Sequence, residues 1–179
     1  MTVSRNTEEI RKKIHTIERE LFELRCELDG RVLELSSGRI EALEISVGGA
    51  LYAISLEPVR EVVPILRCDP VQEAPDWILG TFQYGEEIVP VVDTNFRLNG
   101  ERTVLRPTLK IVLVEALHLT GLVVVDIGDT FTFNREQVVP TPTGIPQADY
   151  LIGALPKTGG VSIFLLSVES LSREVVTGA

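Results

Sequence analysis

The sequence predicts a mostly β protein with a long helix near its N-terminal end and a short helix near its C-terminal end. Short apolar runs of strand length recur over residues 39–166, and glycine-containing turns separate them. A strand spacing of roughly 8 to 12 residues is typical of small barrels and sandwiches. Residues 6–30 instead follow a heptad pattern. We therefore expect an N-terminal helix and linker over residues 1–38 and a sheet-rich domain over 39–179.

Composition and charge exclude several functions. The 179-residue chain carries 17 basic and 26 acidic side chains, a net charge of −9, which disfavours nucleic-acid and anionic-membrane partners. No apolar run approaches the roughly 20 residues that cross a bilayer, so no direct membrane insertion is expected. The first residues are mostly polar, and Cys26 and Cys68 are far apart. These features predict a cytoplasmic protein with reduced thiols.

The N-terminal segment is predicted to be a helix with an apolar stripe. Asn6 and Glu9 have the spacing of a capping box, and Gly30 is a plausible C-terminal stop. The stripe recurs at alternating steps of four and three, as in a coiled coil. It consists of Ile10, Ile14, Ile17, Leu21, Leu24 and Leu28. The pattern leaves three alternatives open: packing on the chain's own domain, self-association into a homo-oligomer, or docking to another protein's helix.

The first strands of the body follow the linker. Residues 40–56 roughly alternate apolar and polar side chains, and Gly48-Gly49 divides them into a hairpin. Residues 58–63 contain Val59, Val62 and Val63 with charged residues between them, as either one helical turn or a short strand. A further short strand is expected over residues 65–68.

The stretch 75–93 carries the clearest hairpin signal. Two short, mostly apolar runs, 78–82 and 88–92, flank Gly85, which supplies the positive φ of a tight reversal. Pro90 cannot donate to a sheet ladder, so its strand is expected at an edge or beside a bulge. Binding residues are common on loop tips held by rigid scaffolds, which makes this tip a candidate binding site. Trp77 precedes it, as either a half-buried anchor or an exposed partner contact.

The remainder continues the β pattern. Residues 94–107 are largely polar and predict a loop of roughly a dozen residues. His118 is expected to be a solvated residue at the reversal between two strands. Strands are predicted at 109–117 and 119–127, around Phe131 and Phe133, at Val138-Val139, at 150–155 and at 161–166, followed by a helical turn or two at 168–175.

Residues 80–93 resemble a segment of CheW-type chemotaxis adaptors, usually written G-x-x-N-L-R-G-x-x-x-P-V-x-D. The matching residues are Gly80, Pro90, Val91 and Asp93. The loop departs from the pattern, with Gln83 for Asn, Tyr84 for Leu, Gly85 for Arg and Glu86 for Gly. Upstream, Tyr52-Ala-Ile and Val59-Arg-Glu-Val62 are also similar to the family. Downstream, Ile152-Gly153, Gly160 and Leu165-Leu166 match, and Ser167 stands where Asp is common.

The resemblance covers residues 39–171 and implies two packed SH3-like barrels with a groove between them. It also implies a bridge between chemoreceptor tip helices and the regulatory domain of a CheA-type histidine kinase. The first barrel would meet the kinase and the groove a receptor helix. We expect partner binding to involve Val59, Val62, Trp77, Gln83, Tyr84, Gly85, Glu86, Val91 and Asp93.

Catalytic chemistry is not predicted. The chain has two histidines, His15 and His118, and no His/Cys cluster with zinc spacing. Glu86 and Glu87 are adjacent, so on a strand their side chains point to opposite faces and cannot form one acid/base dyad. No catalytic residue, metal or cofactor is therefore expected, and the protein is predicted not to be an enzyme.

Two functions remain. The first is an adaptor with reduced or altered affinity for standard partners, because Gly85 lacks the family's arginine side chain and Glu86 adds a negative charge. The alternative is a scaffold that self-associates through its N-terminal helix and acts outside a standard receptor array.

Overall fold

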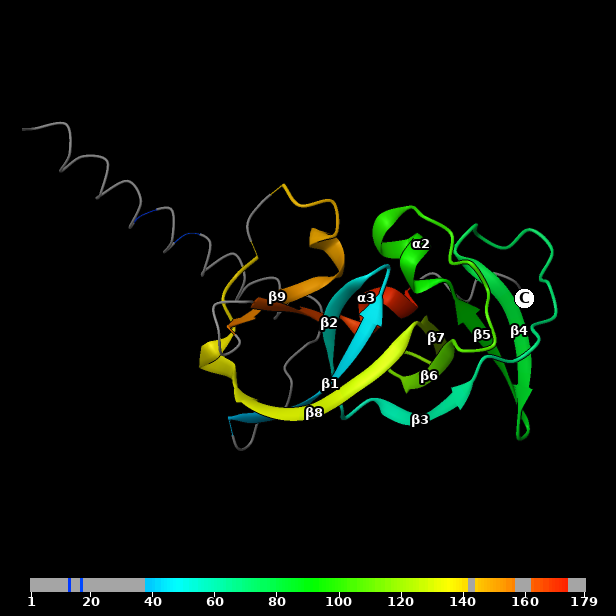
Figure 1. The fold of residues 1–179 in the computed structure, drawn as a ribbon, viewed down its shortest axis with the longest axis horizontal. Coiled ribbons are helices and arrows are strands. Elements are labelled where there is room, and N and C mark those ends of the chain that lie inside the picture. The colour runs from blue at the N-terminus through cyan, green and yellow to red at the C-terminus, as the bar shows by residue number, and fades with distance from the viewer. Residues whose placement is uncertain (1–12, 14–16, 18–37, 142–143, 157–161, 174–179) are drawn as a thin grey trace, which may run out of the picture. The chain divides into compact units, whose positions relative to one another are not determined.

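The computed structural model describes residues 38–141, 144–156 and 162–173, together with Lys13 and Ile17 (Figure 1). Lys13 and Ile17 are helical. The rest of the predicted heptad helix, and with it the predicted self-association, lies outside the described residues. The chain divides into two compact units, Met1–Gly38 and Arg39–Ala179, and the second contains both sheets.

Two five-stranded sheets build this second unit. Sheet A has the strand order β8 (Asp126–Asn134), β1 (Arg39–Val47), β2 (Ala50–Ser55), β10 (Ser162–Leu166) and β9 (Leu151–Pro156). Sheet B has the order β3 (Val59–Pro64), β6 (Lys110–Glu115), β7 (Leu119–Val124), β5 (Glu87–Val92) and β4 (Ile78–Tyr84). The prediction of a mostly β fold is confirmed.

Both sheets follow one plan. In each, the third and fourth strands of the order run parallel, β2 with β10 and β7 with β5, and the other neighbours are antiparallel. Each sheet also curls until its ends meet. Asp69, which follows β3, bridges to Thr81 on β4, and Val139, which follows β8, bridges to Ala154 on β9. One continuous run of chain supplies sheet B, whereas sheet A is assembled from the two ends of the domain.

A short helix follows the equivalent strand of each sheet. Helix α2 (Thr94–Asn99) comes after β5 and α3 (Val168–Ser172) after β10. The side chain of Asp93 accepts from Phe96 N, and that of Ser167 accepts from Ser170 N, so each caps its helix. Two 3₁₀ turns, η1 (Arg135–Gln137) and η2 (Ala148–Tyr150), precede β9.

The alternating side chains of the inner strands fill two cores. On β6, Ile111 and Leu113 face a core inside sheet B, whereas Val112 and Val114 face a core to which both sheets contribute. We call the second group the shared core. It comprises Leu43, Ile45, Val47, Tyr52, Ile54, Val92, Leu98, Val112, Val114, Leu122, Val124, Leu166, Val168 and Leu171. The two sheets are therefore joined by continuous apolar packing.

The predicted loop over 94–107 is wrong in its first part, which forms α2. The buried Asp93 caps this helix, and Gly100, with φ of 73°, ends it. The predicted strand at Val138-Val139 is also wrong. Turn η1 occupies the preceding residues, so Val139 alone bridges to β9.

The predicted strand over 65–68 does not form either. This segment crosses from β3 to the other edge of sheet B, and Ile65 N donates to Leu109 O at 3.0 Å before Asp69 reaches Thr81. Pro90 is predicted at an edge or beside a bulge, and the structure agrees with the second alternative. Strand β5 is an inner strand, and the register of its pairing with β4 shifts between Ile78 and Gly80, close to Pro90. The backbone of Thr81, opposite Pro90, bonds to Asp69 instead, so the missing N–H interrupts no bond to β4.

Candidate partner-binding surface

The hairpin of β4 and β5 ends in a two-residue turn. Tyr84 pairs with Glu87 across it, and Gly85 has φ of 59° while Glu86 stays at negative φ, the pattern of a type II′ turn. Gln83, Gly85 and Glu86 are exposed, and Gln83 Nε2 donates to Gly85 O at 2.9 Å. The structure thus brings four of the predicted site residues together at one exposed tip.

Tyr84 ties this tip to the opposite edge of sheet B. Its hydroxyl donates to a carboxylate oxygen of Glu61 on β3. This hydrogen bond, followed by slight burial and the charge of the carboxylate, raises the pKa of the Tyr84 phenol. The Asp69–Thr81 bridge joins the segment after β3 to β4, and the Tyr84–Glu61 bond joins β3 itself to β4. Both contacts therefore help to hold the two edge strands of sheet B together.

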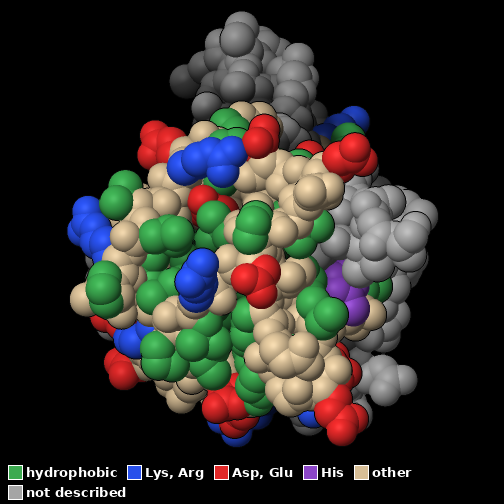
Figure 2. Space-filling view, turned by 90° about the vertical axis from the view of Figure 1, so that its right-hand side faces the viewer, with side chains coloured by type: hydrophobic (Ala, Val, Ile, Leu, Met, Phe, Trp, Pro, Cys, Tyr) green, Lys and Arg blue, Asp and Glu red, His purple; other side chains and the backbone are tan. Residues whose placement is uncertain are grey.

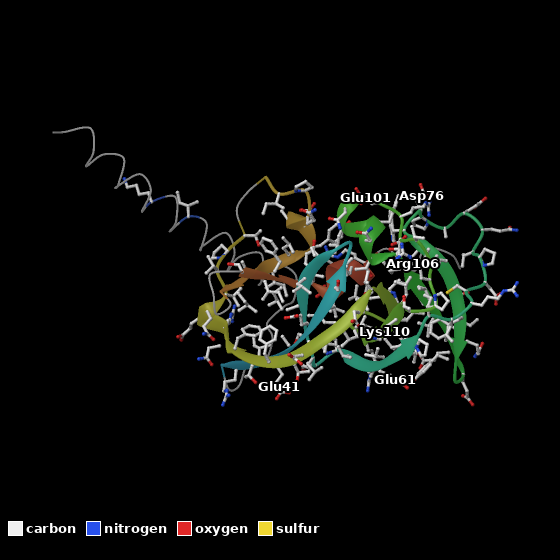
Figure 3. All side chains as sticks on the ribbon, viewed as in Figure 1. Glu41, Glu61, Asp76, Glu101, Arg106 and Lys110 are labelled. Atoms are coloured by element: carbon white, nitrogen blue, oxygen red, sulfur yellow. The ribbon has the colours of Figure 1, made fainter. Side chains whose placement is uncertain are left out.

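Strand β3 contributes a second part of the surface. Val62 is 38% exposed, whereas Val59 is half-buried and packs against the shared core. Arg60 forms an ion pair with Glu115 on β6. Figure 3 shows Glu61 on the side of sheet B away from Asp76 and Glu101. Glu61 therefore lies at the end of the sheet that carries the hairpin tip, in agreement with its hydrogen bond to Tyr84. Val62 is the next residue of β3, so its side chain points to the opposite face of the strand.

Val91 and Asp93 have no exposed surface. Val91 packs in the core inside sheet B. The carboxylate of Asp93 accepts from Phe96 N at 3.2 Å, Thr103 N at 2.9 Å and Thr103 Oγ1 at 2.6 Å. Any part that these two residues have in partner binding is therefore indirect, through the position of β5 and the segment after it.

Trp77 lies at the other end of β4 from the tip. Five strand residues, 78–82, separate Trp77 from Gln83, about 20 Å along an extended strand. The indole is half-buried against the shared core, and the guanidinium of Arg97 lies 4.3 Å from its ring centroid. This environment matches the half-buried anchor that the sequence left open, and the structure does not bring Trp77 to the hairpin tip.

Sequence reasoning missed two residues of this surface. Ile88, next to the tip, is 70% exposed, and Glu61 receives the Tyr84 hydroxyl. The strand period was a usable signal for Ile88, because Val89 and Val91 point inward and their neighbours must point outward. Figure 2 shows hydrophobic side chains gathered around isolated charged ones on the sheet B side. Exposed apolar residues in the segments between β3 and β4 and between α2 and β6 are Leu66, Val71, Val104 and Leu105.

His118 is half-buried, not solvated as predicted. Its Nε2 atom is buried, and burial lowers the pKa of the imidazole. Among the described residues, no group of three or more His, Cys, Asp or Glu side chains could hold a metal ion. Within the same residues, no helix has the length and apolar character required to span a bilayer.

Two curled sheets of one plan, with an exposed hairpin tip on sheet B, define a two-sheet β domain. A sequence model of the CheW-like domain matches residues 41–176, and the chain belongs to that family. This confirms the family that the motifs indicated.

Relatives and a solved structure support the assignment. The chain is 27% identical over 111 residues to the chemotaxis protein CheW of Rhizobium meliloti, covering 60% of this chain and 70% of that protein. It is 25% identical over 133 residues to CheW of Klebsiella aerogenes, covering 73% and 80%. The scaffolding protein TtCheW of Thermoanaerobacter tengcongensis has the same fold, with a TM-score of 0.65, 22% identity and coverage of 72% and 84%. The names of the two relatives agree with the chemotaxis family that the motifs indicated.

Proposed function

We propose that the chain is a non-catalytic, cytoplasmic adaptor in chemotaxis-type signalling that couples a CheA-type histidine kinase to chemoreceptors. The observation that carries the proposal is the exposed tip around Gln83–Glu86, which is held on a strand pair whose inward-facing side chains pack in the core inside sheet B. Val89 and Val91 have 0% exposure, while Ile88 between them and the turn is 70% exposed. A rigid base with an apolar and polar tip is suited to protein recognition.

Each sheet would serve as one of the two SH3-like barrels that the family resemblance implies. Sheet B, through its hairpin tip and Val62, would contact the regulatory domain of the kinase. A receptor tip helix would lie at the margin between the sheets, with its apolar face against them. The adaptor would act by holding two partners in a fixed relation, so no bond is made or broken.

The residues at the tip lead us to expect that this chain binds a standard CheA-type kinase with altered affinity. Gly85 offers no guanidinium to form paired hydrogen bonds, and Glu86 adds a negative charge. The Glu61 carboxylate already accepts from Tyr84. A kinase surface that normally accepts hydrogen bonds from the family's arginine would lose these bonds. It would instead face the carboxylate of Glu86.

Isothermal titration of the full chain with the regulatory domain of a CheA-type kinase tests both statements. A CheW-type protein with the unaltered N-L-R-G loop serves as the reference, and we expect weaker binding by this chain. Equal affinity would refute the altered tip, and no detectable binding would refute the kinase as partner.

A matched pair of variants locates the surface. Ile88→Asp places a charge in the exposed apolar part of the tip and is expected to weaken kinase binding about tenfold or more. Leu51→Asp changes a side chain that is 53% exposed on sheet A and should leave the affinity unchanged. Equal losses in both variants, or none in either, would contradict the proposed surface.

A further inference from the structure

Arg97 on α2 connects the two sheets. Its helix follows β5 of sheet B, yet its guanidinium donates through Nη2 to Arg173 O at 2.8 Å and Ser170 O at 3.3 Å. Both carbonyls lie at the C-terminal end of α3, which follows β10 of sheet A. Carbonyls at a helix end lack intrahelical partners, so a cation from outside the helix satisfies them.

The same guanidinium lies near one aromatic ring from each sheet. Its central carbon is 4.3 Å from the centroid of Trp77, which leads into β4, and 5.4 Å from that of Tyr150, which leads into β9. Backbone bonds anchor the residues that carry these rings, because Asp93 N donates to Trp77 O at 2.7 Å and Ser167 N donates to Tyr150 O at 2.8 Å. The backbone of each aromatic residue is thus bonded to the residue that caps the helix of its own sheet.

The other contacts between the sheets are mostly of a different kind. The shared core is apolar apart from the Tyr52 hydroxyl, and hydrophobic burial is non-directional, so it holds surfaces together without setting their angle strongly. Hydrogen bonds weaken steeply when their angle changes, and a planar guanidinium can satisfy several groups in only one arrangement. Other polar side-chain contacts also cross between the sheets. Asn99 Oδ1 accepts from Gln147 Nε2 at 2.8 Å, and Lys110 on β6 forms an ion pair with Asp126 on β8. The first is neutral and the second is largely exposed to solvent, so each is weaker than the contacts of Arg97.

We propose that Arg97 is an inter-sheet clamp: it fixes the orientation of sheet A relative to sheet B, and therefore the relation between surfaces on the two sheets. The clamp itself does not depend on which proteins those surfaces bind. Its consequence rests on the proposed function, because an adaptor that works by geometry requires a fixed angle between its binding surfaces.

Arg102 supplies a matched control. It also lies over an aromatic ring, 4.8 Å from the Phe96 centroid, and also donates to a backbone carbonyl and a carboxylate, both of Asp76. All of these partners belong to the connections of sheet B. Arg97→Met and Arg102→Met each remove a guanidinium that lies over an aromatic ring and donates to a backbone carbonyl, once between the sheets and once within sheet B. Both substitutions keep most of the side-chain stem.

Pulsed electron paramagnetic resonance measures the effect directly. Spin labels at Thr132→Cys on β8 and Glu87→Cys on β5 report the distance between the sheets in a full chain with Cys26 and Cys68 replaced by serine. We expect one narrow distance distribution for the parent and for Arg102→Met, and a shifted or broadened one for Arg97→Met. Superimposable distributions for Arg97→Met and the parent would overturn the clamp.

Two further measurements separate orientation from stability. Trp77 is the chain's only tryptophan, so acrylamide quenching of its fluorescence should increase in Arg97→Met and remain unchanged in Arg102→Met. A residue that merely stabilised the fold would lower the urea midpoint without moving the distance. If Arg97→Met does not fold, Arg97→Lys keeps the charge without the planar fork, and an unchanged distance there would equally reject the clamp. Failure of the wild-type chain to bind the kinase would remove the proposed function but leave the distance result standing.

Discussion

Asp93 shows, at the scale of single residues, how a motif position can act from inside the fold. The sequence placed it among the binding residues because it closes the hairpin motif. In the structure its side chain is 0% exposed and organises the ten residues that follow it, through Phe96 and Thr103. Sequence alone could not distinguish these roles, because the partners of a carboxylate depend on how the chain folds back toward it.

Asp93→Ala is predicted to destabilise the domain by about 2 to 4 kcal/mol, from the loss of a helix cap and of hydrogen bonds to a buried carboxylate. Urea unfolding followed by circular dichroism measures the change. Thr103→Val removes only the 2.6 Å hydroxyl bond and should cost less. A loss below about 0.5 kcal/mol for Asp93→Ala, typical of surface substitutions, would contradict this role.

Tyr84 makes the second prediction at this scale. Its hydrogen bond to the Glu61 carboxylate raises the pKa of the phenol above its ordinary value of 10.0. Because the folded-state pKa is raised, the stabilisation is fully present below the unfolded pKa near 10 and is lost as pH rises through the folded value. Glu61→Gln removes the charged acceptor and should lower the pKa of Tyr84.

Carbon-13 NMR of the tyrosine rings resolves this titration. Tyr52 is an internal control, because burial is the main reason that its pKa is raised and Glu61 is not among the causes. An unchanged Tyr84 titration in Glu61→Gln would show that the carboxylate does not set its pKa.

At the scale of elements, local sequence predicted hairpins well and short helices poorly. Gly48-Gly49 and Gly85 specify tight turns through their backbone, so both hairpins appear where they were expected. The strand period also identified the buried faces. Helix α2 was missed because its six residues include Thr94, Asn95 and Asn99, which are weak helix formers. The helix begins at the Asp93 cap. This capping residue was not recognised in the sequence because the residues after it are largely polar and indicated a loop.

Gly80 carries a prediction about sheet closure. It has φ of +141°, and a Cβ there would lie 2.4 Å from Asp69 O, the carbonyl that bonds to Thr81. Gly80→Ala should therefore disrupt the bridge that closes sheet B and cost more than about 2 kcal/mol. Gly85→Ala is the control, because its φ of +59° is also unfavourable but a Cβ there meets nothing within 4 Å. Thermal unfolding compares the two, and an equal or smaller loss for Gly80→Ala would show that the close contact relaxes without cost.

At the scale of the whole molecule, the repeated plan could not be read from the sequence. Strands β3 to β7 form sheet B from one continuous run of chain. Strands β1 and β2 instead pair with β8 and β10, which follow sheet B in the sequence. Those pairings, and the isolated bridge at Val139, join residues far apart in sequence, where local periodicity carries no information. The strand spacing alone predicted either small barrels or a sandwich. Only the family resemblance implied two packed barrels.

This topology predicts that the two sheets unfold together. Sheet A cannot assemble until the chain returns from sheet B, and strands of sheet B bury one face in the shared core. Ile54 belongs to the shared core and Ile111 to the core inside sheet B, and both are 0% exposed. Replacing either by alanine should cost about 2 to 5 kcal/mol.

If the sheets form one cooperative unit, each of these substitutions lowers the urea midpoint measured by Trp77 fluorescence as much as that measured by far-ultraviolet circular dichroism. The two probes differ in coverage, since Trp77 reports the lead into β4 whereas dichroism sums over both sheets. Were the sheets independent, Ile111→Ala would move the fluorescence transition and leave part of the dichroism change at its original midpoint. Coincident transitions in both variants are expected, because a sheet that unfolded alone would expose the apolar face of the other to water.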